Sequence, residues 1–292
     1  MVAAFQVGKA PPALPSIRED LGATLEQAGW LLSVINLMTA LGGMAIALTA
    51  DRVGHRRLAI FGTLLAAAAS FAGAFAPNVE SLLVGRIFEG LGFITVVVAI
   101  PSLLLRLTRP GDQRLAMAIW STYMPAGSGT MMVIAAIVLP ATSWRVVWLV
   151  AAAAATLMAI ALLLRAVPRR ELDPLPVARR SGLSEMKEVG TSGGPLAIGV
   201  CFGAYACCWF AIIGFLPTML IERLGYSTST AAVITAFVAI LNVTGNLGAG
   251  WLLHRRVRRV TVIVGATLSM SLCAAGIFVS GVPDLARLMP AE

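Results

Sequence analysis

The chain has 292 residues, of which 58% are hydrophobic and 12% are charged, with a formal net charge of +8. A soluble domain has roughly 25% charged residues, so a chain this long and this poor in charge could not cover a soluble surface. We expect an all-α, polytopic membrane helix bundle instead. The net charge does not indicate nucleic-acid binding, because the cations lie in short segments between apolar runs.

Eight apolar runs are long enough to cross about 30 Å of hydrocarbon, which takes roughly 20 helical residues. They cover 27–50, 57–76, 81–107, 114–139, 145–166, 195–221, 228–253 and 260–282. The apolar stretch from Met1 to Pro15 is too short to cross and has neither the basic leader nor the cleavage site of a signal peptide. We expect it to be the outer end of a helix whose beginning is absent.

The basic residues predict the orientation of the spans. One side carries Arg52, Arg56, Arg57, Arg106, Arg109, Arg114, Arg165, Arg169, Arg170, Arg179, Arg180, Lys187, Arg255, Arg256, Arg258 and Arg259. The opposite side carries Arg18, Arg145, Arg223 and Arg287. Because basic loops stay in the cytoplasm, we predict a multi-pass protein of the plasma (inner) membrane. The long polar segment 167–194 is then a cytoplasmic linker.

An internal repeat indicates two parallel halves. Leu21-Gly22 is followed by a polar turn and a span that ends at Asp51, and Leu224-Gly225 is followed by a polar turn and a span that ends at His254. Both pairs are 203 residues apart (225 − 22 and 254 − 51). The predicted domains are an N-terminal six-helix half over 1–166 with an incomplete first helix, the linker over 167–194, and a partial C-terminal half of three helices over 195–292.

The segment 47–57, Ala-Leu-Thr-Ala-Asp-Arg-Val-Gly-His-Arg-Arg, joins two long apolar spans through a tight turn. It resembles the signature loop between the second and third helices of major facilitator superfamily transporters. The resemblance implies a two-half bundle with its substrate site at the midplane, and a loop that latches one conformation. The latch residues would be Asp51, Arg52, Gly54 and Arg56; a simple basic topology anchor is the alternative.

Repeat and resemblance together lead us to expect a fragment of such a transporter. Position 292 corresponds to position 89 of the first half (292 − 203). The start of the first helix and the last three helices would therefore be absent. A truncated chain of this kind could be unable to transport by itself.

Two opposite charges, Arg86 and Glu89, lie inside the span 81–107. A charge at the membrane centre costs about 2.5–3.5 kcal/mol, so both should face the bundle interior. Their i, i+3 spacing puts them on one helix face, where they can pair. The surrounding sequence is similar to the superfamily's fourth-helix motif, which is associated with proton coupling. Proton or substrate coupling and a buried structural ion pair both remain open.

Other polar side chains within the apolar stretches are candidate substrate-lining residues. They are Gln6, Lys9, Asn36, Tyr123, Tyr205, Trp209, Asn242 and Asn246. Lys9, with Arg86, would attract an anion if both face one cavity; alternatively, its ammonium reaches the outer interface. For the remaining residues, hydrogen bonding between helices is the alternative role.

The sequence therefore predicts a secondary transporter of a small solute or ion, with a proton as the coupling ion and the lipid bilayer as its surroundings. Lys9 and Arg86 favour an anionic solute; the alternatives are efflux of drug-like amphiphiles and a membrane fragment that does not transport. An enzyme is not expected, because the sequence shows no nucleotide loop or nucleophile with a paired base. The four cysteines are interpreted as small core residues, not metal ligands. No cofactor or nucleic-acid partner is expected, and the sequence names no particular solute, transport direction or oligomeric state.

Overall fold

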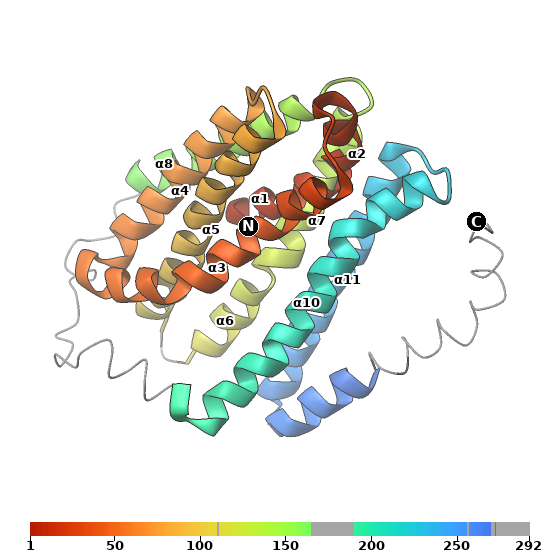
Figure 1. Cartoon of the computed structure of the whole chain (residues 1–292). Helices are drawn as coiled ribbons and strands as arrows, with labels where there is room; N and C mark the ends of the chain where they lie inside the picture. The colour runs from red at the N-terminus through yellow and green to blue at the C-terminus, as the bar shows by residue number, and fades with distance from the viewer. Residues whose placement is uncertain (110, 165–189, 256, 270–271, 273–292) are drawn as a thin grey trace. The chain divides into compact units, whose positions relative to one another are not determined.

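The computed structural model describes residues 1–109, 111–164, 190–255, 257–269 and 272 (Figure 1). These residues form helices and turns, which confirms the expected all-α class. The chain separates into two compact units, Met1–Thr244 and Gly245–Glu292. In the second unit the described residues include the last turns of one long helix and a short apolar helix, Arg259–Ser269. The contacts below belong to the first unit.

The chain begins with short helical pieces and continues with long helices. The short pieces are η1 (Val2–Ala4), α1 (Phe5–Gly8) and α2 (Ala10–Leu21). The remaining helices are α3 (Leu25–Val53), α4 (His55–Ala74), α5 (Val79–Leu107), α6 (Gln113–Ser121), α7 (Tyr123–Val138), α8 (Trp144–Leu164), α10 (Gly193–Glu222) and α11 (Thr228–His254).

Seven candidate membrane spans lie among the described residues, with α6 and α7 together forming one of them (Leu115–Val138). They match the first seven predicted runs, and the largest disagreement is at the start of the span in α10, at 199 against a predicted 195. The predicted run 260–282 lies mostly outside the described residues. Most of the predicted linker, 167–194, also lies outside the described residues. The division of the chain into domains at this linker therefore stays a prediction.

Local signals in the sequence set the ends of these helices. Thr24 and Gln27 form a reciprocal capping box at the start of α3, which satisfies two backbone N–H groups. Between Val53 of α3 and His55 of α4 stands a single residue, Gly54, with φ +96°. A side chain at that φ would be strained, so glycine permits the tight turn that segment 47–57 was predicted to make.

The repeat is visible in the backbone. Gly22 follows α2 with φ +65°, and Gly225 stands after α10 with φ +67°. The next helices begin at Leu25 and Thr228, which are 203 residues apart (228 − 25). The same left-handed turn therefore leads into the same kind of helix in both repeats.

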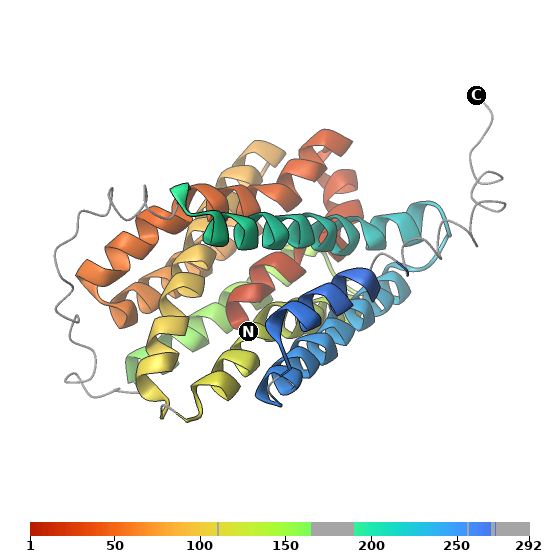
Figure 2. The same ribbon diagram turned by 90° about the horizontal axis from the view of Figure 1, so that it is seen from below.

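The helices α3, α4, α5 and α8 lie side by side, as Figures 1 and 2 show, and glycines let backbones approach closely at some of the helix crossings. A Cβ atom added to Gly92 of α5 would lie 2.7 Å from the Gly62 carbonyl oxygen of α4. A Cβ atom on Gly8 of α1 would lie 2.5 Å from the Ser128 carbonyl oxygen of α7. Small residues at such crossings let two backbones approach, as membrane helices require.

Helix α10 contacts the first repeat near its C-terminal end. Its buried hydrophobic residues are Ile213 and Leu220, and it packs there against α2. Cys201, Cys207 and Cys208 lie nearer its start and are exposed. The prediction that these three cysteines are core residues is therefore wrong, because the part of α10 that carries them has little to pack against in this unit.

Candidate functional site

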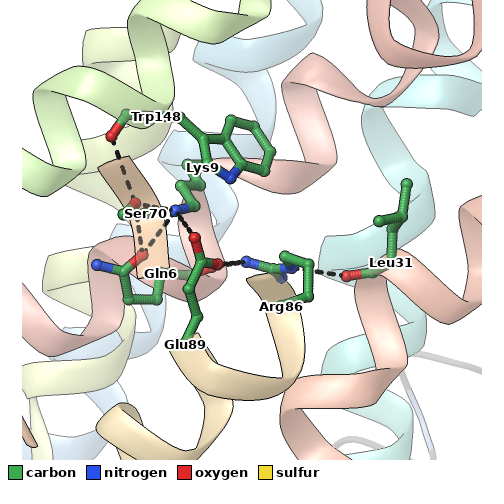
Figure 3. A network of polar contacts seen from close by, with 7 residues as sticks. All are labelled: Gln6, Lys9, Leu31, Ser70, Arg86, Glu89 and Trp148. Carbon is green, nitrogen blue, oxygen red and sulfur yellow. Dashed lines mark hydrogen bonds and ion pairs between the residues drawn. The ribbon is translucent and has the colours of Figure 1, made fainter. Parts of the chain in front are cut away.

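A buried charge network lies where the first helical pieces meet α5 (Figure 3). One carboxylate oxygen of Glu89 accepts from Lys9 Nζ at 2.6 Å, and the other accepts from Arg86 Nη1 at 2.7 Å. All three side chains are at most 1% exposed. With two cations for one anion, the fully ionised cluster carries one net positive charge.

Arg86 also connects three helical segments. Its Nε donates to the Leu31 carbonyl of α3 at 2.9 Å, and its Nη1 donates to the Gln6 carbonyl of α1 at 2.6 Å. Helical order is weakened beside Gln6, because Pro11 and Pro12 have no N–H to give to carbonyls one turn earlier. The guanidinium thus ties α5 to the interrupted first helix.

The ammonium of Lys9 has three acceptors, which match its three N–H donors. Besides Glu89 these are Gln6 Oε1 at 2.6 Å and Ser70 Oγ of α4. The Trp148 ring of α8 lies 4.5 Å from Nζ, a cation–π contact. Sequence reasoning missed Ser70 and Trp148, and the one available signal was a hydroxyl within the alanine-rich span 57–76.

An apolar cavity of about 150 Å³ lies beside this network. Its wall consists of Met1, Val2, Ala3, Gln6, Thr63, Ala66, Gly92, Phe93, Val96, Val97, Ile100, Trp120, Tyr123, Ala155, Met158 and Leu162. Gln6 belongs both to the wall and to the network, whereas Lys9, Arg86 and Glu89 do not line the cavity. The two cations therefore face a carboxylate, not this cavity.

The structure thus brings five of the predicted residues to one place: Gln6, Lys9, Arg86 and Glu89 in the network, and Tyr123 on the cavity wall. The other candidates in the first unit lie elsewhere. Asn242 Nδ2 of α11 donates to the Tyr205 hydroxyl of α10 at 3.0 Å, a bond between helices. Trp209 packs against a core cluster of α7, α10 and α11, and Asn36 is half-buried on α3. Asn246 belongs to the second unit.

The signature-like loop is attached to α8 by Arg56. Its Nη2 donates to the carbonyls of Leu162 and Leu163, at 3.0 and 3.3 Å. Arg52 is exposed, and the side chain of Asp51 lies outside the described part of the structure. The latch role of this loop stays a prediction.

No group of three metal-ligating side chains occurs among the described residues. The core of the polar network is one carboxylate, that of Glu89, between two cations, Lys9 and Arg86. Such a group can store charge, exchange a proton or hold helices together. Because the network lies inside an apolar bundle, a substitution that leaves one of its charges unpaired would cost free energy.

Comparison with known proteins places the chain among membrane carriers. The sequence model of the Major Facilitator Superfamily matches residues 1–289. The multidrug efflux pump LfrA of Mycolicibacterium smegmatis is 33% identical over 140 residues, which is 48% of this chain and 28% of the pump. The D-xylose transporter of Levilactobacillus brevis is 27% identical over 38% of this chain and 24% of its own length. The matched stretch thus spans less than a third of each of these relatives.

Two solved structures share the fold. A bacterial homolog of the human lysosomal transporter Spinster, inward-facing and unoccupied, gives a TM-score of 0.66 at 19% identity, over 87% of this chain and 60% of that one. The inward-open xylose transporter XylE from E. coli gives a TM-score of 0.56 at 13% identity, over 87% and 67%. At such identities the likeness concerns the fold.

Proposed function

Because the chain belongs to the Major Facilitator Superfamily, we propose that it forms part of a secondary transporter that moves a small organic solute by alternating access. The observation that carries this proposal is the buried network of Lys9, Glu89 and Arg86. Ionisable groups inside a membrane bundle are costly and mark solute or proton pathways. The chain is a multi-pass membrane protein, and we assign it to the plasma membrane with its basic loops and linker in the cytoplasm.

A proton is the coupling ion in this proposal. Glu89 is shared between two cations, so gain of a proton by Glu89 or loss of one from Lys9 changes the net charge of the network by one. Either event weakens the 2.6 Å ion pair that joins the first helical piece to α5. A proton therefore biases an equilibrium between two arrangements of these helices, which is what coupling requires.

Amphiphilic organic molecules are the solute class that the described residues favour. The cavity wall is apolar and aromatic, with few polar groups, as sites for such molecules usually are. The anionic solute expected from Lys9 and Arg86 has less support, because both cations already pair with Glu89. The relative LfrA, which is named a multidrug efflux pump, agrees with this choice.

Uptake into liposomes that contain the purified chain tests the proposal. The probes are ethidium as an amphiphile, benzoate as an anion and D-xylose as a sugar, each with and without an imposed pH gradient. We expect ethidium uptake that depends on the gradient and is abolished by a protonophore. Glu89→Gln should abolish it, whereas Glu80→Gln, an exposed position on the same helix, should not.

The contrary outcome is equally clear. If the inserted, folded chain moves none of the three probes under a pH gradient, the proposal fails for this chain and a non-transporting membrane protein becomes the better description. Benzoate uptake without ethidium uptake would restore the anionic solute.

A further inference from the structure

We infer that the turn after α11 is a binding site for the headgroup of an anionic phospholipid. α11 ends at His254, and the next helix, Arg259–Ser269, begins after a short turn (Figure 1). The apolar span Thr228–Leu253 ends next to this turn, so the turn lies at the membrane surface, at the depth of the lipid headgroups. Binding there does not depend on the proposed transport.

The turn carries positive charge without a counter-charge of its own. The sequence 255–259 is Arg-Arg-Val-Arg-Arg, and neither aspartate nor glutamate occurs from 223 to 283. Arg255, Arg258 and Arg259 are exposed, and none of the described residues of the second unit is acidic. A cluster of arginines next to a membrane span attracts anionic lipids.

The loop at the same place in the first repeat has an acid that this turn lacks. At the offset of 203, Asp51 and Arg52 correspond to His254 and Arg255, so a histidine stands where the first repeat has a carboxylate. Arg52 is exposed even though the helices that follow it, α4, α5 and α8, pack together. An exposed arginine at this place in the repeat therefore does not require missing neighbours, and its counter-charge has to come from outside the turn.

Trp251 holds Arg255 at the end of α11. The Arg255 Cζ atom lies 4.1 Å from the centroid of the Trp251 ring, a cation–π contact between residues one helical turn apart. The contact restricts the position of the arginine side chain and leaves its charge in place. Trp251 is 54% exposed, and tryptophan at the end of a membrane span is typical of the headgroup region.

The hydrogen bonds of the turn place Arg255 and Arg258 at its two ends. The backbone closes α11, because the Val257 N–H donates to the Leu252 carbonyl at 3.1 Å. The Arg258 carbonyl accepts from the Val262 N–H at 3.3 Å, as the residue before a helix does. Guanidinium groups give strong, charge-assisted hydrogen bonds to phosphate oxygens. The proposed site therefore consists of Trp251, Arg255 and Arg258.

Lipid titrations followed by native mass spectrometry test the inference. The purified full chain in detergent is titrated with phosphatidylglycerol, which is anionic, or with zwitterionic phosphatidylcholine that has the same acyl chains. We expect the first phosphatidylglycerol to bind about five- to twenty-five-fold more tightly, because each arginine near the lipid surface contributes about fivefold. Equal affinity for the two lipids would overturn the inference.

Two double variants that remove the same charge separate a site from diffuse attraction. Arg255→Gln with Arg258→Gln should lower the affinity for phosphatidylglycerol about five- to twenty-five-fold and leave that for phosphatidylcholine unchanged. Arg57→Gln with Arg109→Gln changes two exposed residues on the same predicted side of the membrane and should leave both affinities nearly unchanged. Equal losses in the two double variants would mean that net charge alone attracts the lipid, and would overturn the site.

Variants of Trp251 test the ring contact without any change of charge. Trp251→Leu should weaken phosphatidylglycerol binding about two- to fivefold, the worth of an exposed cation–π contact. Trp251→Phe keeps a ring and should restore part of this loss. An unchanged affinity in Trp251→Leu would contradict the assigned site.

Inorganic phosphate distinguishes a lipid site from a site for any phosphate. We expect an excess of it not to displace phosphatidylglycerol, because it has no acyl chains to pack against α11; displacement would overturn the lipid as the occupant. Thermal unfolding in detergent checks that each variant is folded, and Arg255→Gln alone, with a loss of about fivefold, replaces a double variant that does not fold. Lipid binding at this turn without ethidium movement would support the site and contradict the proposed function.

Discussion

Arg18 and Glu222 join the two repeats by an ion pair, with Arg18 Nη1 2.7 Å from Glu222 Oε1. Arg18 is near the end of α2 and Glu222 is the last residue of α10, the corresponding helix of the second repeat. A second contact supports the first, because Met132 of α7, Ile213 of α10 and residues of α11 share a core cluster. Both contacts lie toward the side opposite the predicted cytoplasmic loops. They hold the repeats together there.

Reversal of one charge should loosen this contact by a small amount. The two side chains are 30% and 48% exposed, and exposed ion pairs contribute about 0.2–1 kcal/mol. For Arg18→Glu we therefore expect up to about a fivefold shift in favour of separated helix ends. Spin labels at the exposed positions Leu25 and Leu224 would report it as a longer distance distribution. The double variant Arg18→Glu, Glu222→Arg should restore the original distances; unchanged distances in the single variant would refute the role.

Removing the anion of the buried network should cost more stability than removing one cation. Glu89→Gln leaves Lys9 and Arg86 buried together without a counter-charge, and such losses cost about 3–5 kcal/mol. Lys9→Met leaves Arg86 and Glu89 as a balanced pair at 2.7 Å. We expect thermal unfolding in detergent to rank Glu89→Gln well below Lys9→Met, with Lys9→Met below the parent. If Lys9→Met were instead less stable than Glu89→Gln, the hydrogen bonds of Lys9 would contribute more to stability than the balance of charges in the network does.

Local features of the network followed from the sequence, and distant ones did not. The spacing of Arg86 and Glu89 predicts a shared helix face, and the two side chains do pair. Lys9 is 80 residues away from Glu89, so their contact depends on how the first helical piece packs against α5. The only signal from Ser70 was a hydroxyl within an alanine-rich span, and it did not indicate which residue the hydroxyl would contact. Packing, not local propensity, chose these partners.

The repeat carried the fold prediction further than helix length alone. Its offset of 203 predicts both the left-handed Gly225 and the start of α11. The lining roles of Asn36, Trp209 and Asn246 stay predictions, because a polar residue within an apolar span can serve another helix as well as a solute. Asn242 donates a hydrogen bond to Tyr205, so these two residues do join one helix to another.

The glycine at position 92 should be intolerant of even a methyl group. Its added Cβ would lie 2.7 Å from both the Ala66 nitrogen and the Gly62 carbonyl oxygen of α4, so the helices would have to separate. We expect Gly92→Ala to destabilise the chain by about 1–3 kcal/mol, the usual cost of overpacking. Thermal unfolding in detergent measures the change.

Gly85 on the same helix is the matched control. Its added Cβ would meet atoms at 3.6 Å, which is ordinary contact. Because alanine is the better helix former by about 1 kcal/mol, Gly85→Ala should be neutral or stabilising. Equal losses in the two variants would show that close approach of α4 and α5 is not what position 92 provides.

Acid should weaken the contact between α2 and α8 through Asp20. Its carboxylate accepts from the side chain of Arg145 and from Trp144 Nε1, the latter at 3.0 Å. These two hydrogen bonds hold the pKa of Asp20 below its usual 3.8, and the bond from Arg145 has the larger effect. A lowered pKa means that the folded state favours the ionised form, so the contribution to stability is full above pH 3.8 and is lost as pH falls through the lowered value.

The comparison of the parent chain with Asp20→Asn isolates this effect. We expect the parent to be the more stable of the two by a constant amount from pH 7 down to about pH 4, and the difference to shrink at lower pH. The amount should be small, because Asp20 and Arg145 are 45% and 34% exposed and water screens the pair. Thermal unfolding at several pH values measures it, at constant ionic strength. A difference that already shrinks between pH 7 and 5 would show that another titrating group controls this contact.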